Sequence, residues 1–199
     1  MLDSIDYYNQ YATQYYEDTV NLELDDIRDE FIEYLPENSE IMDLGCGSGR
    51  DSLYFIERGF DVTAVDGSIE LCDLASIHIG QDVLNLKYNE LDFTDVFDGV
   101  WACASFTHST LKELKEVLGK IKESLKDGGI LFLSFKYGDF DGVRHNKYYK
   151  YYRTNEIRNI LGEYNEFNIL KINKVNDIRQ ARSEEKWIHV IVKKEEKNN

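Results

Sequence analysis

The chain has 199 residues, of which 42% are hydrophobic and 13% aromatic, with a single proline. These proportions predict a globular protein of one domain and exclude an intrinsically disordered chain. The formal net charge is −15, and residues 1–86 hold 20 of the 38 acidic residues but only three of the 23 lysines and arginines, which excludes wrapping of DNA or binding to an anionic membrane.

Neither the beginning of the sequence nor its cysteines carry a targeting or metal signal. The first ten residues lack the basic and apolar regions of a signal peptide, and no apolar run approaches the ~20 residues that span a bilayer. We therefore expect a cytoplasmic protein without a membrane partner. Cys46, Cys72 and Cys103 are odd in number and form no C-x-x-C pair, so neither a disulfide framework nor a metal site is expected.

Two helices are predicted before the first strand. In residues 4–19, Tyr7, Tyr11 and Tyr15 recur at every fourth position and would share one face of a helix. Residues 25–35 repeat apolar side chains at the same spacing, and Pro36 ends this second helix. We interpret residues 1–36 as a helical cap, residues 37–193 as an α/β core and residues 194–199 as a polar tail.

Strands and helices then take turns along the chain. Strands are predicted at residues 40–44, 61–65, 84–88, 97–104 and 130–135, and helices at 51–58, 69–79 and 110–125. A polar segment and a helix near 155–162 follow, and the strands near 167–172 and 187–192 have no helix between them. This order predicts a doubly wound, mostly parallel, seven-stranded Rossmann-like sheet with an antiparallel hairpin at one edge.

The stretch "EIMDLGCGSGRDS", residues 40–52, places three glycines at alternate positions directly after the first strand. In a doubly wound sheet this turn borders the ligand crevice, and glycine lets the backbone approach a ligand closely. A dinucleotide site would need glycine where this chain has Arg50. Asp43 would repel a pyrophosphate and attract an ammonium group. The turn therefore favours a ligand that carries a positively charged amine.

Two further acids follow the next strands. Asp66 stands 21 residues after Gly45, where a carboxylate can accept both hydroxyls of a ribose; its alternative is a helix cap, although Ser68 is the better candidate cap. Asp92, in "NELDF", would accept a hydrogen bond from an adenine amino group while the Leu91 backbone meets the ring edge, or it is only a turn residue. A ribose and an amine together indicate an amino-acid nucleoside.

Residues 41–138 contain four motifs in a fixed order: "IMDLGCGSGRDS", "VTAVDGS", "NELDF" and "FDGVWACASFTHS". Through these motifs the segment resembles the class I S-adenosylmethionine-dependent methyltransferases. It is most similar to small bacterial enzymes of the tellurite-resistance type. The resemblance implies S-adenosylmethionine as cofactor and S-adenosylhomocysteine as product. It places Asp43 near the methionine amino group and a tyrosine of the first helix at the methionine carboxylate. The implied cofactor contacts are Asp43, Gly45, Cys46, Gly47, Asp66, Gly67, Ser68, Leu91, Asp92, Ala104, and Tyr11 or Tyr15.

Three segments are candidates for the acceptor side. His108 stands where the family often has a residue facing the transferred methyl group and would act as a general base, with a packing role as the alternative. The segment "RHNKYYKYYR", residues 144–153, could receive an anionic or aromatic substrate through Arg144 and Tyr148, or be a solvated loop. Related small methyltransferases also carry an arginine-rich segment where Arg179 and Arg182 stand, and surface hairpin charge is the competing interpretation.

Methyl transfer from a sulfonium is an in-line displacement that needs alignment, not a catalytic triad or a metal. The segment after the fourth strand, "ACAS", has no proline, unlike the (N/D)-P-P-(Y/F) turn of the family branch that methylates amino groups of DNA bases. We therefore expect a methyltransferase of small molecules, a monomer or homodimer without a DNA partner. The alternatives are an RNA methyltransferase, a non-catalytic cofactor-binding regulator and, from the fold alone, a nicotinamide-dependent oxidoreductase.

Overall fold

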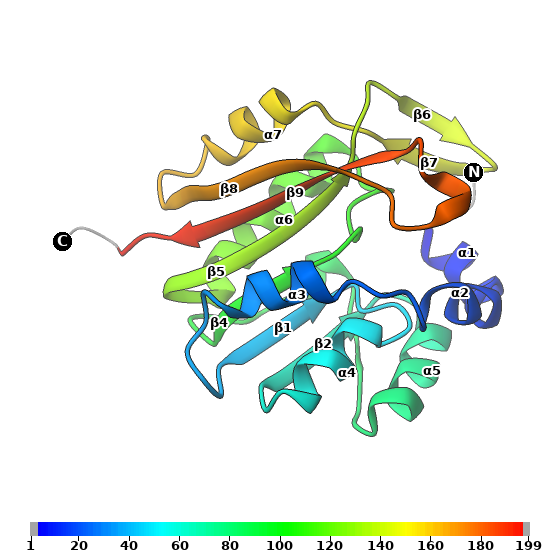
Figure 1. Ribbon diagram of the computed structural model, residues 1–199, viewed down its shortest axis with the longest axis horizontal. Helices are drawn as coiled ribbons and strands as arrows, with labels where there is room; N and C mark the ends of the chain where they lie inside the picture. Colours follow the sequence, from blue (N-terminus) through cyan, green and yellow to red (C-terminus); the bar gives the residue numbers. More distant parts are fainter. Residues whose placement is uncertain (1–3, 197–199) are drawn as a thin grey trace.

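The computed structural model describes residues 4–196, except for the side chains of residues 25 and 180. Its centre is a seven-stranded sheet in the order β3-β2-β1-β4-β5-β9-β8 (Figure 1). The strands are β1 (Glu40–Leu44), β2 (Asp61–Asp66), β3 (Leu84–Asn85), β4 (Phe97–Ala102), β5 (Leu125–Lys136), β8 (Phe167–Asn176) and β9 (Lys186–Lys194). Strands β1 to β5 pair in parallel, whereas β9 pairs antiparallel with β5 and β8. The predicted fold class is confirmed.

Helices cover both faces of the sheet (Figure 1). One face carries α3 (Asp25–Ile32), α4 (Arg50–Glu57) and α5 (Ile69–Ile79), and the other carries α6 (Leu111–Ser124) and α7 (Thr154–Leu161). Successive side chains of β1 enter different cores, because a strand alternates its faces. Ile41 packs with Phe31 of α3 and Phe55 of α4, whereas Met42 belongs to the core that contains Leu118 of α6. This double covering explains the apolar strands of the sequence.

The predicted single helix at residues 4–19 is two helices, α1 (Ser4–Gln10) and α2 (Ala12–Thr19). The chain bends at Tyr11, whose backbone has φ −116° and ψ 23°. Neither glycine nor proline marks this bend. Both short helices contact α5, so tertiary packing sets the angle between them, against the local preference for one continuous helix.

The polar segment before residue 155 contains a second, two-stranded sheet that the sequence analysis did not predict. Its strands are β6 (Asp141–Arg144) and β7 (Lys147–Lys150), which pair antiparallel. The two residues between them, His145 and Asn146, have positive φ values of 48° and 64°, the geometry of the tight turns that join hairpins. Histidine and asparagine tolerate positive φ values better than most residues, but the pair His-Asn predicts a hairpin turn less clearly than Asn-Gly does.

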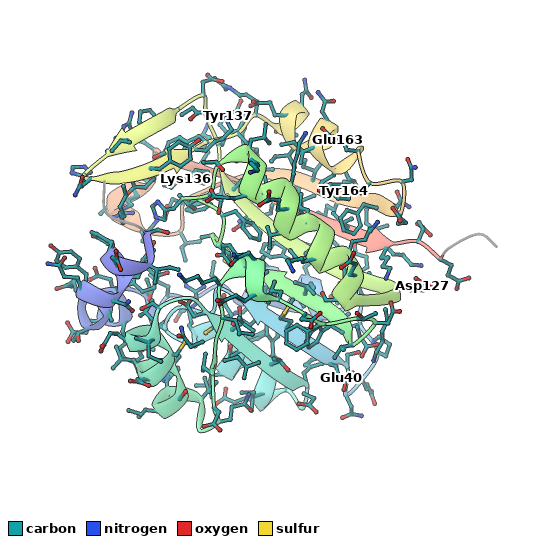
Figure 2. The ribbon with its side chains drawn as sticks, turned by 180° about the vertical axis from the view of Figure 1, so that it is seen from behind. Glu40, Asp127, Lys136, Tyr137, Glu163 and Tyr164 are labelled. Carbon is teal, nitrogen blue, oxygen red and sulfur yellow. The ribbon has the colours of Figure 1, made fainter. Side chains whose placement is uncertain are left out.

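The parallel strands all run toward α1, α2 and this hairpin. In Figure 2, Glu40 and Asp127 lie near the starts of β1 and β5, whereas Lys136, at the end of β5, lies toward the hairpin. Ligands of doubly wound sheets bind beyond the carboxyl ends of the strands, which places the candidate site on the side of α1 and the hairpin. Within residues 4–196, no helix is both long enough and apolar enough to cross a membrane.

Candidate active site at the carboxyl ends of the strands

A cavity of about 360 Å³ lies beyond the ends of β1, β2 and β4. Its wall combines the glycine turn, the start of α5, the turn after β3, the segment after β4 and parts of α1, α2 and α6. The predicted cofactor contacts that line it are Gly45, Gly47, Asp66, Gly67, Ser68, Ala104 and Tyr15, and the predicted base His108 lines it too. The predicted contacts Asp43, Cys46, Leu91, Asp92 and Tyr11 are described by the structure but do not line it.

The glycine turn requires its glycines. Gly45 and Gly47 have φ values of +77° and +58°, a region that side chains rarely adopt. A Cβ at Gly45 would lie 2.9 Å from the Ser105 Oγ, and a Cβ at Gly47 would lie 3.0 Å from the Tyr15 ring. The backbone N–H groups of Gly45 and Cys46 both donate to the carbonyl of Val65, at 2.8 and 3.0 Å. The turn is thus a bare backbone surface fixed to the end of β2.

Arg50 occupies the position where a dinucleotide fingerprint has its third glycine, and the structure shows how the chain accommodates it. The close helix packing that this glycine usually permits is provided by Gly49, where a Cβ would lie 2.9 Å from the Ile79 Cγ2 and 3.2 Å from the Ala75 Cβ of α5. The Arg50 guanidinium turns away and makes two hydrogen bonds to Asp51, at 2.8 and 2.7 Å.

Asp66 fixes the glycine turn to the start of α5. Its two carboxylate oxygens accept hydrogen bonds from the backbone N–H groups of Gly47, at 2.9 Å, and Ser68, at 2.8 Å. Burial raises its pKa above the ordinary value, although these N–H groups oppose the shift. The Ser68 hydroxyl accepts from Leu71 N and caps α5, as predicted. A carboxylate can accept about four hydrogen bonds and Asp66 lines the cavity, so the predicted ribose contact is compatible with this bracing role.

Asp43 lies beneath the glycine turn and does not line the cavity, so its expected contact with a ligand amine stays a prediction. The alternation of β1 turns its side chain to the α4 face, where the Ser52 hydroxyl donates to it at 2.6 Å. It is 2% exposed. Burial, reinforced by the negative charge of Asp51, raises the pKa of Asp43 to about 7. Cys46 is likewise turned inward, onto Ala75 and Ile79.

Next to Asp43, the sequence analysis missed a buried charge cluster. Asp51 accepts hydrogen bonds from Arg50, from Arg28 at 3.2 Å and from the Trp101 indole at 2.9 Å. Burial alone would raise the pKa of Asp51, but Arg50 and then Arg28 outweigh it and hold the pKa below the ordinary value. The cluster joins α3, the start of α4 and β4 directly behind the glycine turn.

His108 is held as a neutral imidazole. Its Nδ1 lies 2.7 Å from the carbonyl oxygen of Tyr148 and its Nε2 lies 3.0 Å from the hydroxyl of Tyr8. A carbonyl only accepts, so Nδ1 carries the proton and Nε2 accepts from Tyr8. Burial lowers the pKa of His108 to about 4. The predicted base therefore reaches the cavity together with Tyr8, to which the sequence analysis gave no role.

Of the two candidate tyrosines for the methionine carboxylate, only Tyr15 lines the cavity, whereas Tyr11 is 44% exposed. The bend at Tyr11 explains the difference, because it breaks the shared helical face on which both were predicted to lie. Tyr8 and Tyr15, seven positions apart, instead meet with their ring centroids 5.1 Å apart. Tyr8 stands on α1 and Tyr15 on α2, so this contact depends on how the two helices pack, which the spacing of the tyrosines does not show.

The predicted adenine contacts Leu91 and Asp92 lie outside the cavity wall. Asp92 is exposed, and Leu91 is buried in the α6 core. The predicted strand at 84–88 ends at Asn85, and a 3₁₀ turn at Tyr88–Glu90 follows it. The residues that this change places at the cavity are Lys87, Tyr88 and Asn89. The Tyr88 hydroxyl donates to the carbonyl of Ser105 at 2.7 Å, so the turn is tied to the segment after β4.

The predicted substrate residues lie outside the cavity wall, and three of them have partners elsewhere. Arg144 lies 3.6 Å from the ring centroid of Phe140, and the Tyr148 hydroxyl donates to Asp141 at 2.7 Å. Arg179 forms an ion pair with the buried Asp177 at 2.5 Å. Arg182 ends the 3₁₀ turn Gln180–Arg182 between β8 and β9. These arginines and Tyr148 stabilise the hairpins in which they stand.

Comparison with known proteins agrees with this geometry. Residues 41–129 match the family model described as a methyltransferase domain. The methyltransferase YqeM of Bacillus subtilis is 33% identical over 117 residues, which are 53% of this chain and 47% of the relative. A glycine/sarcosine N-methyltransferase of Aphanothece halophytica is 32% identical over 135 residues, 60% of this chain and 51% of the relative. The chain thus spans about half the length of these curated relatives.

Solved structures share the fold over nearly the whole chain. The Burkholderia thailandensis 1,6-didemethyltoxoflavin-N1-methyltransferase superposes with a TM-score of 0.75 at 21% identity and covers 98% of this chain and 92% of its own. The magnesium protoporphyrin IX methyltransferase of Synechocystis gives a TM-score of 0.73 at 17% identity and covers 98% of both chains. Residues 41–129 are thus similar to a methyltransferase domain, and the solved structures show that the chain shares the fold of methyltransferases over nearly its whole length.

Proposed function

We propose that the protein transfers a methyl group from S-adenosylmethionine to a small-molecule acceptor by direct in-line displacement. The observation that carries this proposal is the cavity at the ends of β1, β2 and β4, bounded by Gly45, Gly47 and Asp66. Its volume of about 360 Å³ falls within the range of roughly 300 to 1,000 Å³ that is usual for small-molecule sites. A Cβ at either glycine would meet a neighbouring side chain, so the bare backbone of the turn lets Ser105 and Tyr15 pack closely at the edge of the cavity.

The residues fit the cofactor in three places. The glycine turn would face the methionine part, with Tyr15 beside Gly47. Asp66 would accept the ribose hydroxyls through its remaining lone pairs, and the turn at Lys87 and Tyr88 would meet the adenine. When bound, the cofactor supplies a methyl group on a positively charged sulfur, which is already an excellent leaving group. The chain itself has to hold the acceptor in line and exclude water.

His108 and Tyr8 can accept the proton that the acceptor loses. Tyr8 donates its own proton to the Nε2 of His108, so a proton arriving at the Tyr8 oxygen can be passed on to that nitrogen. His108 then becomes a cation, with its Nδ1 hydrogen still bound to the carbonyl of Tyr148. Because burial lowers the pKa of His108 to about 4, the neutral base is the resident form at physiological pH.

A small acceptor is favoured over a nucleic acid by the charge of the chain. The acidic residues are concentrated before residue 87, and a polyanion would be repelled from that half. The relatives point the same way, since the Burkholderia enzyme is described with bound 1,6-didemethyltoxoflavin. The absence of a DNA partner, the monomeric or homodimeric state, the cytoplasmic location and the narrower likeness to tellurite-resistance-type enzymes stay predictions.

Calorimetry with two cofactors tests the proposal. We expect S-adenosylhomocysteine to bind with a stoichiometry of about one per chain and to raise the melting temperature, while NAD⁺ at the same concentration does neither. Transfer of label from methyl-labelled S-adenosylmethionine to an extract of small metabolites, and not to an RNA fraction, would then support the small-molecule acceptor. Absent binding of S-adenosylhomocysteine at millimolar concentration, or tighter binding of NAD⁺, would overturn the proposal.

A further inference from the structure

Lys147, on the first position of β7, has its amine next to three tyrosine rings. Its Nζ lies 3.5 Å from the ring centroid of Tyr7, 5.1 Å from that of Tyr8 and 5.6 Å from that of Tyr149. The residue is 7% exposed. The cluster joins α1 to the hairpin, which are more than 130 residues apart in the chain. We call Tyr7, Tyr8, Lys147 and Tyr149 the tyrosine-lysine cluster.

Lys147 differs from the other buried lysines of the described chain in having no acidic partner. Lys136 forms ion pairs with Asp177 and Glu185, and Lys194 pairs with Asp95 at 3.2 Å. For Lys147, no carboxylate within residues 4–196 lies at ion-pair distance and no acceptor takes a hydrogen bond from its amine. Burial is the cause that lowers its pKa to about 8. The Lys147 residue is buried over most of its length, whereas its amine is not fully enclosed, and the tyrosine faces offset part of the cost of removing it from water.

The tyrosine-lysine cluster adjoins the cavity through Tyr8, whereas its other three residues stand next to the cavity wall without lining it. Tyr8 belongs to both, and His108, which lines the cavity, has its ring centroid 4.5 Å from that of Tyr149. The positive charge of Lys147 contributes to the lowered pKa of His108, so the two groups are within electrostatic reach. An acceptor that reaches the Tyr8 and His108 end of the cavity would therefore meet the field of this ammonium.

The alternation of β7 explains why this lysine faces inward. Lys147 and Tyr149 share one face of the strand and point to α1, whereas Tyr148 and Lys150 share the other and both bind Asp141, at 2.7 and 2.8 Å. The basic residues of the hairpin therefore have two separate roles. Lys150 is neutralised within the hairpin, and Lys147 is held without a counter-charge beside the proposed site.

We propose that the tyrosine-lysine cluster selects a planar acceptor that carries a negative charge, a carboxylate or an acidic hydroxyl, which pairs with the amine of Lys147 while its ring packs against the tyrosines. This inference rests on the proposed function and adds the chemical class of the acceptor. A neutral acceptor leaves the ammonium without a partner, and a cationic acceptor is repelled by it. The anionic one supplies the missing hydrogen-bond acceptors in a poorly hydrated setting, where a charged hydrogen bond is strong.

Three probes of one shape but different charge test the inference on the full chain saturated with S-adenosylhomocysteine. Benzoate, benzamide and benzylamine are titrated by calorimetry or by ligand-observed NMR. We expect benzoate to bind at least about tenfold more tightly than benzamide and benzylamine to bind least. Lys147→Met should abolish the preference for benzoate, Lys147→Arg should retain part of it, and Lys150→Met, on the other face of the same strand, should leave it unchanged.

The comparison of probes with the unaltered protein is decisive even where a variant fails to fold. Equal affinities for benzoate and benzamide, a preference for benzylamine, or no binding of any probe at millimolar concentration would each overturn the inference. A loss of the benzoate preference in Lys150→Met equal to that in Lys147→Met would also overturn it. Failure of the proposed function is distinguished by the first titration, since S-adenosylhomocysteine itself would then not bind.

Discussion

The variant Asp66→Asn tests the double role of this carboxylate. Asp66 accepts hydrogen bonds from Gly47 N and Ser68 N through different oxygens. Asparagine has one carbonyl oxygen, and its amide nitrogen is only a donor. One of the two backbone N–H groups would therefore lose its acceptor and face another donor. The glycine turn and the start of α5 would no longer be held by one side chain.

The expected loss follows from these contacts. A hydrogen bond to a charged group contributes about 1.5 to 3 kcal/mol, but burial disfavours the charged form of Asp66, as its raised pKa shows. The variant removes the cost of burying the carboxylate charge together with one of its hydrogen bonds. We therefore expect a net loss of about 1 to 2 kcal/mol in the free energy of unfolding, which lowers the melting temperature of a chain of this size by roughly 2 to 8 °C. Loss of the ribose contact should weaken S-adenosylhomocysteine binding roughly ten- to hundredfold.

Thermal unfolding and calorimetry on the same samples separate the two effects. The control is Asp92→Asn, an exposed acid outside the cavity wall, for which both quantities should stay within about 0.5 kcal/mol of the unaltered protein. A variant Asp66→Asn with unchanged stability would refute the bracing role. A loss of S-adenosylhomocysteine affinity in Asp92→Asn larger than that in Asp66→Asn would refute the assignment of the adenine end to the turn at Lys87 and Tyr88.

Three further substitutions probe the surroundings of the glycine turn. Gly49→Ala should destabilise the protein by about 1 to 3 kcal/mol, because φ at Gly49 is +75° and the new Cβ would lie 2.9 Å from a methyl group of α5. The control Gly119→Ala lies in α6 with nothing within 4 Å of its Cβ and should stabilise the protein by up to about 1 kcal/mol. Urea unfolding that ranks the two variants the other way would contradict this expectation. Asp51→Asn should cost about 3 to 5 kcal/mol in the same assay, because the cationic Arg50 would stay buried without its carboxylate partner, and a loss below 1 kcal/mol would count against the cluster. Burial raises the pKa of Asp43 to about 7, so the folded state binds its proton more tightly than the unfolded chain, whose value is about 4; the contribution of Asp43 to stability is therefore fully present below about pH 4 and is lost as pH rises toward 7. The difference in unfolding free energy between the unaltered protein and Asp43→Asn should change across that window, and a difference independent of pH would refute the shift.

The sequence predicts the sheet and the glycine turn because their signals are local. Apolar strands bounded by turns, and glycines at alternate positions, are visible within a dozen residues of chain. Asp66 was found for the same reason, since its distance from Gly45 is set by one helix and one strand. These predictions depend on covalent spacing alone.

The rest of the site depends on tertiary packing, which the spacing does not reveal. The bend at Tyr11 results from docking of two short helices on α5. It decides that Tyr8 and Tyr15 reach the cavity. The early end of β3 places Lys87, and not Asp92, at the cavity wall, and nothing in "NELDF" signals it. The basic segment 144–153 is a candidate from the sequence alone, but only the pairing of β7 shows that Lys147, and not Arg144, faces α1.

The position of α3 divides the residues before β1 into two parts that differ in how well the fold tolerates their replacement. Phe31 is fully buried, with its ring centroid 5.2 Å from that of Trp101, and a Cβ at Gly99 would lie 2.9 Å from its ring. Excision of everything before β1 would thus open a void in the protein's interior. Within the described residues, none of the three hydrophobic cores contains a residue of α1 or α2, so we expect a graft that replaces these two helices and joins at residues 20–24 to change acceptor preference while the sheet stays intact.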